Sequence, residues 1–531
     1  MRIFNRPDKK YKKGRDSGGR REARFAGTWY ESDSSALVKQ MDGFLESARK
    51  ELSESPSEAD FPDNPAPQGN LLALIVPHAG YMFSGATAAY AYEFAAQNTS
   101  PERIFLLGPS HYVGFEGVAL SHCSAFATPL GDMNLERKTV DELSRHPLYG
   151  FSDEIHDREH SLELQLAFLK HLFPDAQLIP LVVGAFKNSS EIRYAGSILR
   201  SQIRPGDLVV VSSDFTHYGP RYDYVPFNGD FPEQVKKLDE DAFSYIKDHD
   251  LEGFLNFHDQ TGCTICGFYP CSLLLSILPE GSRGSLLKYG TSRDSYKEDS
   301  RNSVSYLALV LTDPGAEVAW SAESESELEL ELELSESERK DLLSLARKVV
   351  SEFARRGRQI AYADAGLAKT AALETPRGVF VTLFKRAPDL DQERERQLRG
   401  CIGYICPVKP LYQAVIDNAI GAASKDYRFT PLKANELEDL EIEISVLTPL
   451  RPVESIDQIE IGKHGIVFHL RDRQSVFLPH VATEFGWSLT ETLEQLALKA
   501  GLDKDAWSRP EATFEVFESI SFEENEFNKI S

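Results

Sequence analysis

A series of apolar, strand-like runs in the first half of the chain constrains the fold more than any other feature. The runs read LLALIV, RIFLLG, AQLIPLVVG and DLVVVSSD, and amphipathic stretches such as HSLELQLAFLKHLF separate them. Strands that alternate with helices form largely parallel sheets, and strands covered on both faces are apolar throughout. The sequence therefore predicts an α/β domain with a mostly parallel sheet covered by helices.

The chain divides into more than one domain, because 531 residues are too many for a single hydrophobic core. An acidic, low-complexity segment rich in Glu and Leu follows a Pro-Gly pair and is typical of a linker. The first residues are rich in Lys and Arg and predict a flexible arm. We expect a basic arm at 1–19, a first domain at 20–312, an acidic linker at 313–335 and a second domain at 336–531.

The start of the second domain carries a helix-capping signal. Ser335 and Glu338 have the spacing of a capping box, in which each side chain binds a backbone N–H at the start of a helix. Apolar residues then recur at helical spacing, at Leu342, Ala346, Val349 and Phe353. These signals predict a helix that begins near residue 336.

Charge and composition exclude several classes of partner. The formal net charge is -24 at pH 7, which repels the phosphate backbone of nucleic acid. No stretch approaches the roughly 18 apolar residues that span a bilayer, and the basic start lacks the apolar segment of a secretory signal. We therefore expect a cytoplasmic protein with no nucleic-acid or membrane partner. The 6 cysteines are too sparse for a disulfide framework, which leaves free thiols or metal ligands.

Several of the apolar runs end in a turn that carries a histidine. VPHAG contains His78, LGPSH contains His111, and SSDFTHYG contains His217. The carboxyl ends of parallel strands meet at one edge of a sheet, so we expect these side chains to share a pocket. For any one of them, an inert histidine in a strand-end turn is the alternative.

A cysteine completes the predicted metal site. In TGCTICGFYPCSLLL we assign the functional thiol to Cys266 and packing roles to Cys263 and Cys271, because no second Cys-x-x-Cys follows at zinc-ribbon spacing. Imidazole and thiolate ligands suit iron(II), copper or zinc better than magnesium or calcium.

Further polar residues are candidates for supporting this site. His160 and Glu163 share a helical face, from which they would orient a metal-ligating side chain by contacting it. The alternative is that they form an ordinary i,i+3 pair on the protein surface. Asp214 either holds His217 or caps the turn that follows.

Motifs spread over residues 20–312 resemble those of the Memo family, also called AmmeMemoRadiSam system protein B. They are REARFAGTWYESD, VPHAGYMFSG, LGPSHYVGF, EHSLELQL, SSDFTHYG, TICGFYP and RNSVSYLAL. The resemblance implies a fold like that of class III extradiol dioxygenases, with metal ligands at His78, His111 and Cys266 and an acid/base histidine at His217. A cysteine stands where the dioxygenases have a carboxylate, so the resemblance does not extend to catechol cleavage.

The second half resembles the AMMECR1 family, known in microbes as AmmeMemoRadiSam system protein A. The motifs include TPRGVFVTL, LRGCIGYICPVKPL, AASKDYRFTPL, LEIEISVLTP and FLPHVATEFGWS. The resemblance implies an α+β domain with antiparallel strands. Arg399, Cys401, Asp426 and Arg428 are predicted to form a polar cleft for an anionic ligand. The alternative is a tight turn at the glycines of RGCIG, with Cys401 as a packing residue.

Together the two resemblances indicate a fusion of two proteins of one system, and its radical SAM protein is the expected partner. The first functional hypothesis is an iron- or copper-binding redox protein or oxidoreductase of unknown substrate, in which His217 moves a proton. The second is a non-catalytic binding or scaffold protein that uses the dioxygenase-like pocket to recognise a peptide or a small anion.

Overall fold

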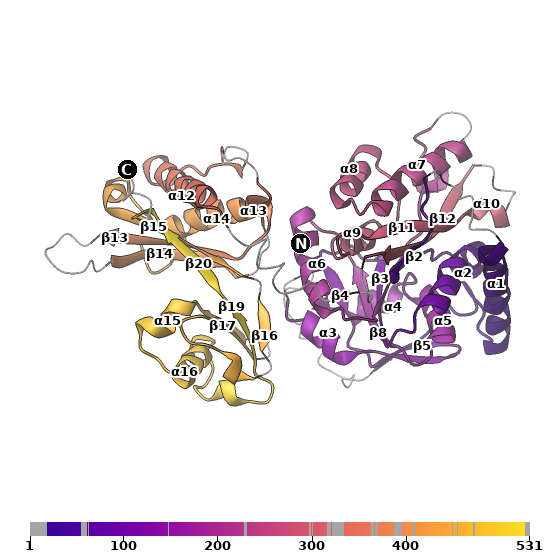
Figure 1. Cartoon of the computed structure of the whole chain (residues 1–531), viewed down its shortest axis with the longest axis horizontal. Coiled ribbons are helices and arrows are strands. Elements are labelled where there is room, and N and C mark those ends of the chain that lie inside the picture. The colour runs from indigo at the N-terminus through magenta and orange to yellow at the C-terminus, as the bar shows by residue number, and fades with distance from the viewer. Residues whose placement is uncertain are drawn as a thin grey trace. The chain divides into compact units, whose positions relative to one another are not determined.

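The structure is a computed structural model of the chain, and its two compact units are Met1–Ala322 and Glu323–Ser531 (Figure 1). The predicted basic arm, apart from residue 19, and most of the predicted acidic linker lie outside the described residues. None of the helices in the described parts is long and apolar enough to cross a membrane. The structure describes residues 19–525 except 55–60, 62, 147, 228–230, 297–298, 300, 316–319, 321–333, 363–365, 367–369, 387–395, 406–408, 449, 454 and 471–472.

The first unit is built on a 9-stranded sheet in the order β10-β12-β2-β9-β3-β8-β4-β7, with β11 also paired to β12. Its central strands β2, β9, β3 and β8 are parallel, whereas the pairings of β10, β11 and β12, and of β4 with β8, are antiparallel. The prediction of a largely parallel sheet is thus confirmed for its centre. The strands are β2 Asn70–Val76, β3 Arg103–Pro109, β4 Val118–Leu120, β7 Tyr149–Phe151, β8 Gln177–Val183, β9 Leu208–Ser212, β10 His217–Tyr218, β11 Arg283–Thr291 and β12 Ser303–Asp313.

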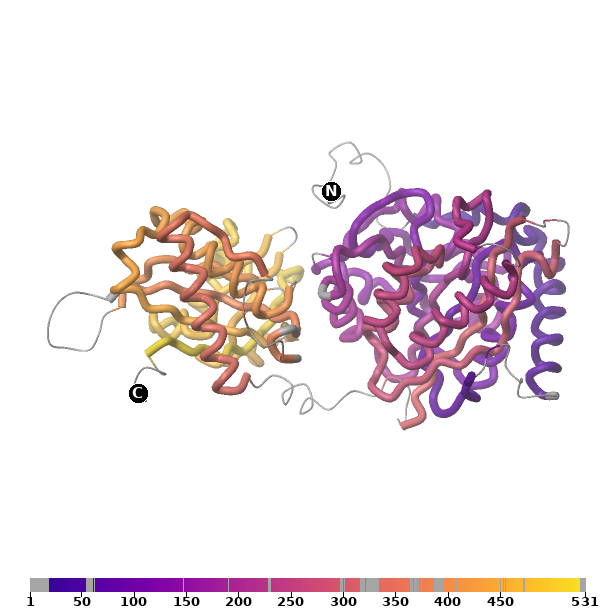
Figure 2. Tube along the Cα trace, turned by 90° about the horizontal axis from the view of Figure 1, so that it is seen from above, coloured from indigo at the N-terminus to yellow at the C-terminus, as the bar shows by residue number. Residues whose placement is uncertain are grey.

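Helices cover both faces of this sheet, as predicted (Figure 1). One face packs against α1 Ser34–Glu54, α2 Tyr81–Asn98 and α5 Glu163–Leu172. The indigo α1 lies along the outside of the unit, where it packs on α2 (Figure 2). The helices of the other face are α3 Arg137–Leu143, α6 Ser189–Gln202, α7 Phe231–Lys247, α8 Leu251–Thr261 and α9 Phe268–Leu275. Smaller elements are β1 Arg20–Arg21, β5 Ala125–Thr128, β6 Gly131–Asn134, α4 Asp153–Arg158, α10 Ser292–Ser295 and the 3-10 turn η2 Pro220–Tyr222.

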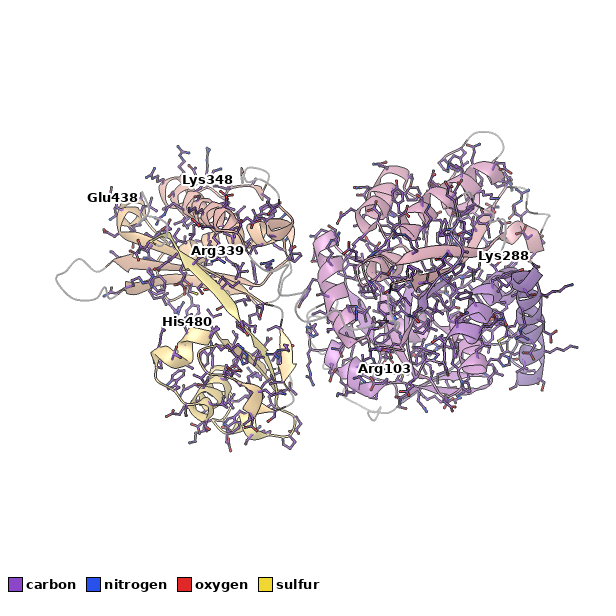
Figure 3. All side chains as sticks on the ribbon, in the orientation of Figure 1. Arg103, Lys288, Arg339, Lys348, Glu438 and His480 are labelled. Carbon is purple, nitrogen blue, oxygen red and sulfur yellow. The ribbon has the colours of Figure 1, made fainter. Side chains whose placement is uncertain are left out.

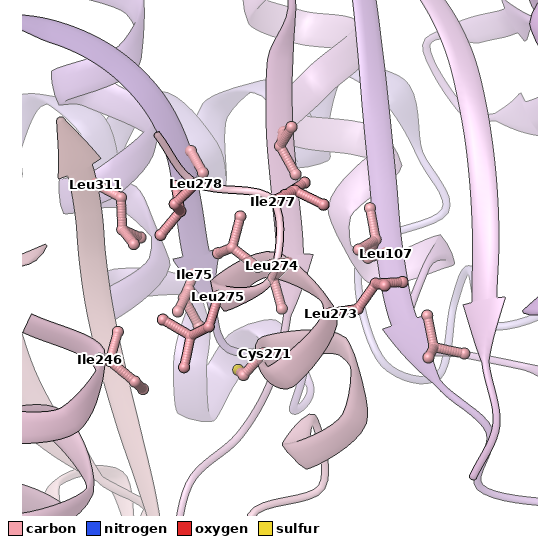
Figure 4. Close-up of a cluster of buried hydrophobic side chains, with 14 of the residues drawn as sticks. Ile75, Leu107, Ile246, Cys271, Leu273, Leu274, Leu275, Ile277, Leu278 and Leu311 are labelled. Carbon is pink, nitrogen blue, oxygen red and sulfur yellow. The ribbon is translucent and has the colours of Figure 1, made fainter. Parts of the chain in front are cut away.

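The apolar strands supply two separate cores because successive side chains point to opposite faces. In β9, Val209 and Val211 join one core, and Leu208 and Val210 join the other. The first core includes Cys271, Leu273 and Leu274 of α9, which pack near Ile75 and Leu107 of the sheet (Figure 4). This packing fixes the start of α9 against the sheet, and Cys266 lies just before that start.

The second unit is an α+β fold of two antiparallel sheets, which confirms the predicted class. The predicted capping box of Ser335 and Glu338 is present at the start of α12. The first sheet has β14 Arg396–Tyr404, β13 Val379–Arg386, β15 Leu440–Leu447 and β20 Ser519–Glu523, covered by α12 Glu336–Arg356 and α14 Leu411–Ser424. The second has β16 Arg451–Val453, β19 Thr513–Phe517, β17 Gly465–Leu470 and β18 Arg473–Phe477, with α15 Pro479–Glu484 and α16 Leu489–Lys499. Short elements are α13 Ala371–Glu374, η4 Ala434–Asp439, η5 Ile456–Gln458 and η6 Ala506–Ser508.

Candidate metal centre

Neighbouring parallel strands place several predicted site residues at one edge of the main sheet. β9 lies between β2 and β3 and runs parallel to both. His78 follows the end of β2, Asp214 follows the end of β9, and His111 follows the end of β3, each at the second position beyond its strand. Because the three strands end at the same edge, residues that are far apart in the sequence meet there.

His217 and Cys266 reach the same edge from adjacent elements. His217 begins β10, whose partner β12 lies beside β2. The backbone N–H of His217 donates to Thr264 Oγ1 at 2.8 Å, which ties β10 to the turn that carries Cys266. The N–H of Gly267 donates to Ser213 Oγ at 3.0 Å, which holds this turn against the end of β9.

The ligand atoms of the predicted site lie close together. The distance from His78 Nε2 to Cys266 Sγ is 3.2 Å. Ligand atoms of His78, His111 and Cys266 all lie within 4.8 Å of one another, and the same holds for Asp214, His217 and Cys266. The structure therefore brings together the residues that the sequence selected, with the Cys266 sulfur common to both groups.

The hydrogen bonds of Ser212 determine which nitrogen of His78 carries the hydrogen. Ser212 Oγ donates its one hydrogen to the Ser161 carbonyl at 2.6 Å and accepts from Gln165 Nε2 at 2.8 Å. His78 Nδ1 lies 2.9 Å from the same oxygen, which has no second hydrogen to offer. Nδ1 must therefore be the N–H donor, and the lone pair of His78 is on Nε2, facing Cys266.

Glu159 determines the tautomer of His111 in the same way. Its Oε1 accepts from His111 Nδ1 at 2.8 Å, and its Oε2 accepts from the His111 backbone N–H at 2.7 Å. Burial raises the pKa of Glu159, but hydrogen bonding and charge at His111 outweigh this effect and lower the pKa, so the carboxylate is ionised. An ionised carboxylate only accepts hydrogen bonds, which leaves Nε2 of His111 as the ligand atom.

His217 also has its Nδ1 hydrogen engaged by the protein. Nδ1 lies 2.9 Å from the Phe215 carbonyl oxygen and 3.1 Å from that of Thr264. Carbonyl oxygens only accept, so Nδ1 carries the hydrogen and Nε2 has a lone pair. This state suits either proton acceptance or metal ligation.

The ligand atoms at this edge of the sheet are suited to binding a metal cation. The Nε2 atoms of His78, His111 and His217 gather around the Cys266 sulfur, whose single S–H donates to the Asp214 carbonyl oxygen at 3.4 Å. Converging lone pairs repel one another unless a proton or a cation lies between them. Imidazole nitrogens with a thiolate sulfur are ligands that iron, copper and zinc accept.

Burial shifts the protonation of the site toward neutral groups. It lowers the pKa of His78 well below its usual value and lowers that of His160 to about 4, so both imidazoles are neutral near pH 7. Burial also raises the pKa of the Cys266 thiol and of the Asp214 carboxyl. A bound cation would reverse the last two shifts, because it stabilises the thiolate and the carboxylate.

Asp214 holds the turn of His78. Its Oδ1 accepts from the backbone N–H of His78 at 2.7 Å and of Ala79 at 3.3 Å. The sequence left open whether Asp214 holds His217 or caps the following turn, and the observed hydrogen bonds correct both expectations. The contact fixes the end of β2 against the end of β9.

His160 lines the pocket. Its ring lies 4.3 Å from the ring of His111 and 4.4 Å from that of Trp29. Tyr112 places its hydroxyl 3.2 Å from His160 Nδ1. His160 therefore packs directly behind the His111 ligand.

Glu163 does not face the pocket, which corrects the expectation that it orients a ligand with His160. Its Oε1 accepts from the N–H of Phe25 at 2.7 Å and from the hydroxyl of Tyr30 at 3.1 Å. Its Oε2 accepts from Arg21 Nη1 at 2.7 Å and from the N–H of Arg24 at 3.1 Å. Glu163 thus anchors the N-terminal segment that carries Trp29.

A cavity of about 820 Å³ opens beside the candidate ligands. His78, His111 and His217 contribute to its walls. Its aromatic walls include Trp29, Tyr222 and Tyr296. A pocket with convergent polar groups and aromatic walls is typical of a ligand or substrate site.

Sequence reasoning missed the residues that orient the ligands, Glu159, Ser212 and Gln165. Ser212 ends an apolar run and Glu159 precedes His160, so each stands beside a selected residue. Those positions are weak signals, because polar residues next to strand ends and histidines are common. Their partners lie 47, 48 and 134 positions away in the sequence, so only the fold identifies them.

The predicted cleft of the second unit is partly assembled. Asp426 Oδ2 accepts from the N–H of Cys401 at 2.9 Å and from Arg428 Nη2 at 2.7 Å, and Arg428 lowers the pKa of Asp426 to about 2. Arg399 binds Glu436 instead, at 2.8 and 3.1 Å. Both arginines are therefore paired with carboxylates within the protein, and an anionic ligand here stays a prediction.

Cys401 lies in a strand rather than beside a tight turn. β14 spans Arg396–Tyr404, which corrects the expectation of a turn at the glycines of RGCIG. A Cβ on Gly400 would lie 2.2 Å from the Ala422 carbonyl oxygen, so glycine permits the close approach of α14. Burial raises the pKa of the Cys401 thiol, whose sulfur accepts from Thr382 Oγ1 at 3.3 Å.

The comparisons with known proteins agree with this architecture. Residues 21–310 match the family described as Memo-like protein, and residues 343–522 match the family described as AMMECR1. The chain is 33% identical over 264 residues to "Protein memo-1 homolog" of Caenorhabditis elegans, covering 48% of this chain and 70% of that protein. It is 32% identical over 307 residues to "Protein MEMO1" of Homo sapiens, covering 55% of this chain and 97% of that protein.

One solved structure shares sequence with part of the chain. It is the crystal structure of the uncharacterized protein PH0010 from Pyrococcus horikoshii, which is 34% identical, covers 34% of this chain and 89% of that chain, and has a TM-score of 0.31. With the two matched ranges in this order, the chain belongs to the Memo-like family and is a fusion of a Memo-like domain with an AMMECR1 domain.

Proposed function

We propose that the Memo-like domain is an iron- or copper-dependent redox protein or oxidoreductase, with His78, His111 and Cys266 as its metal ligands. The proposal rests mainly on the tautomer that the two histidines His78 and His111 have in common. Each donates its Nδ1 hydrogen to the protein, to Ser212 and to Glu159, and each offers an Nε2 lone pair within reach of the Cys266 sulfur. A metal-ligating histidine has this arrangement, in which a second hydrogen bond orients the ring.

The residues around the ligands have distinct roles in this proposal. Iron or copper, when bound, supplies one-electron chemistry and a Lewis acid next to the cavity. His217 accepts a proton at Nε2 from a substrate in the cavity, since its Nδ1–H is held by backbone carbonyls. Trp29 and Tyr222 form apolar walls, which exclude water from part of the site.

Metal analysis of protein purified without oxygen tests the proposal. We expect His78→Ala and Cys266→Ser to lower the affinity for iron or copper by more than about 100-fold, since loss of an orienting partner alone costs 10–100-fold. The matched control is His122→Ala, because the His122 side chain is 58% exposed and lies outside the ligand groups. If the first two variants keep wild-type metal content, the assignment is wrong.

A second candidate function is recognition of a peptide or a small anion without catalysis. Met82 and Tyr296 line the cavity and are 67% and 51% exposed, so apolar surface surrounds its mouth. Exposed apolar side chains at a pocket favour protein or peptide contacts. Selection of binding peptides from a displayed library, with and without a chelator, separates the two functions: binding that survives metal removal favours recognition.

The expected partner, a radical SAM protein, belongs to the same proposal. The chain has no Cys-x3-Cys-x2-Cys motif of its own, so cluster-based radical chemistry would come from a separate protein. Fusion of the two domains raises the effective concentration of each near the other, which suits steps that follow one another. Co-purification of the full chain with that protein tests the association.

A further inference from the structure

We propose that the pocket has a second position for a divalent transition-metal ion, formed by Asp214, His217 and the same Cys266 sulfur that serves the first position. This inference rests on the proposed metal site of His78, His111 and Cys266. The experiment below distinguishes the failure of one from the failure of the other.

Two groups of three potential ligand residues share the Cys266 sulfur. Ligand atoms of Asp214, His217 and Cys266 lie within 4.8 Å of one another, as do those of His78, His111 and Cys266. Cys266 is the one member common to these two groups, so its sulfur is within reach of both sets of ligand atoms. Paired metal ions in enzymes lie about 3.5–4 Å apart, a separation that one bridging atom spans.

Asp214 is a buried carboxylate that has no cationic partner. It is 5% exposed, and its hydrogen bonds, from the N–H groups of His78 and Ala79, all go to Oδ1. Across the described parts of the chain, no lysine or arginine forms an ion pair with it. When a buried carboxyl group is ionised, it is paired with a cation or coordinates a metal. Oδ2 is therefore placed to serve as a metal ligand.

His217 presents the second ligand atom. The Phe215 and Thr264 carbonyls hold its Nδ1–H, and the Nε2 lone pair remains. The ring of Tyr222 packs against the imidazole at 5.1 Å between centroids in an edge-on arrangement, which restricts rotation of the ring. The backbone of His217 is in turn fixed by Thr264 at 2.8 Å. A ligand held in this way needs little reorganisation to bind an ion.

The ligands of the two positions match two divalent ions in charge and in chemical type. One thiolate from Cys266 and one carboxylate from Asp214 offset part of the charge of two divalent ions. Nitrogen, sulfur and oxygen ligands of this mixture suit zinc and iron(II). Occupation of the second position and proton acceptance by His217 exclude each other, because both use the Nε2 lone pair.

Cobalt(II) titration of the full-length apoprotein under anaerobic conditions tests the proposal. Equilibrium dialysis counts the bound ions, and thiolate-to-cobalt absorption reports coordination by sulfur. We expect two cobalt ions per wild-type chain and one in Asp214→Asn and in His217→Ala. Asp214→Asn retains a side-chain oxygen for the N–H groups of His78 and Ala79, so the turn is preserved. His122→Ala is the control and should retain both ions.

Electron paramagnetic resonance provides a second measurement. Two cobalt(II) ions that share the Cys266 sulfur couple magnetically, so the signal per ion should fall when the second ion binds. A signal that simply doubles overturns the shared sulfur. One ion in the wild type, lost in His78→Ala, overturns this inference and leaves the proposed function intact. No bound ion overturns both, and two ions in Asp214→Asn and in His217→Ala overturn the second position.

Discussion

The carboxylate of Glu159 binds His111 at two points, the backbone N–H at 2.7 Å and the ring Nδ1 at 2.8 Å. This double contact sets the position and the tautomer of the ring together. Residues that hydrogen-bond to a metal-ligating side chain in this way contribute about 10–100-fold to metal affinity. We expect Glu159→Ala to weaken metal binding by about that factor, as measured by competition with a chelator. Glu154→Gln on the exposed side of α4 should bind like the wild type, and wild-type affinity in Glu159→Ala would refute the positioning role.

Ser212→Ala should destabilise the Memo-like domain and weaken metal binding. The change leaves the His78 Nδ1–H and one Gln165 N–H without their buried acceptor, which costs about 1–3 kcal/mol per unpaired group. The free energy of unfolding and the metal affinity should both fall, because His78 is no longer held in one tautomer. Ser201→Ala, at an exposed serine of α6, is the control. An unchanged metal affinity in Ser212→Ala would contradict the assignment.

Glu163→Gln should lower stability with little effect on metal affinity. Arg21 and Glu163 form a buried ion pair at 2.7 Å, with side-chain exposures of 1% and 0%. Removing one charge leaves the other buried and unpaired, which costs about 3–5 kcal/mol. Thermal unfolding and chelator competition measure the two effects on the same sample. A large loss of metal affinity at full stability would restore the expectation that Glu163 orients a ligand.

The stability of the apoprotein should fall as the pH drops from 6.5 to about 4, in part because of His156. Burial lowers the pKa of His156 from 6.5 to about 4, and Nε2 donates to the Ala119 carbonyl at 2.9 Å. The unfolded chain takes up the proton first, so the stabilisation is complete above pH 6.5 and is lost as the pH falls through 4. The contribution is about 3 kcal/mol. Chemical denaturation should show a smaller pH dependence in His156→Gln, and an equal dependence would rule out His156 as the cause.

Cys401 should react slowly with thiol reagents near neutral pH. Burial raises the pKa of its thiol, and the thiolate is the reactive form. We expect alkylation by iodoacetamide to be several-fold slower than that of a small-molecule thiol with an ordinary pKa. Mass spectrometry of peptides from timed reactions measures the rate. Faster alkylation than the reference thiol would indicate an activated cysteine, and denatured protein is the control for accessibility.

In the second unit, adjacent residues predict some structural features, whereas other features depend on distant parts of the chain. The capping box of Ser335 and Glu338 is a local pattern, and the prediction of a helix start there is confirmed. The motif FLPHVATEFGWS contains α15, on which His480 lies (Figure 3). The glycines of RGCIG suggested a turn, whereas Gly400 lies in a strand and permits the close approach of α14, a contact that the local sequence does not reveal.

The same distinction applies to the candidate metal centre, where some residues could be predicted from adjacent sequence and others could not. The apolar runs and their terminal histidines determined the sheet, its edge and the choice of His78, His111 and His217, since strand signals depend on a few adjacent residues. Glu163 was misassigned because its partner Arg21 is 142 positions away.

From the sequence by itself came the family, the order of the two domains and the residue types at the strand ends, because these depend on short motifs. Only the tertiary structure decided which nitrogen of each histidine carries its hydrogen and that Cys266 belongs to two ligand groups. The physical reason is that a hydrogen-bond direction is set by neighbours in space, and those neighbours meet only when the strands of the sheet are assembled.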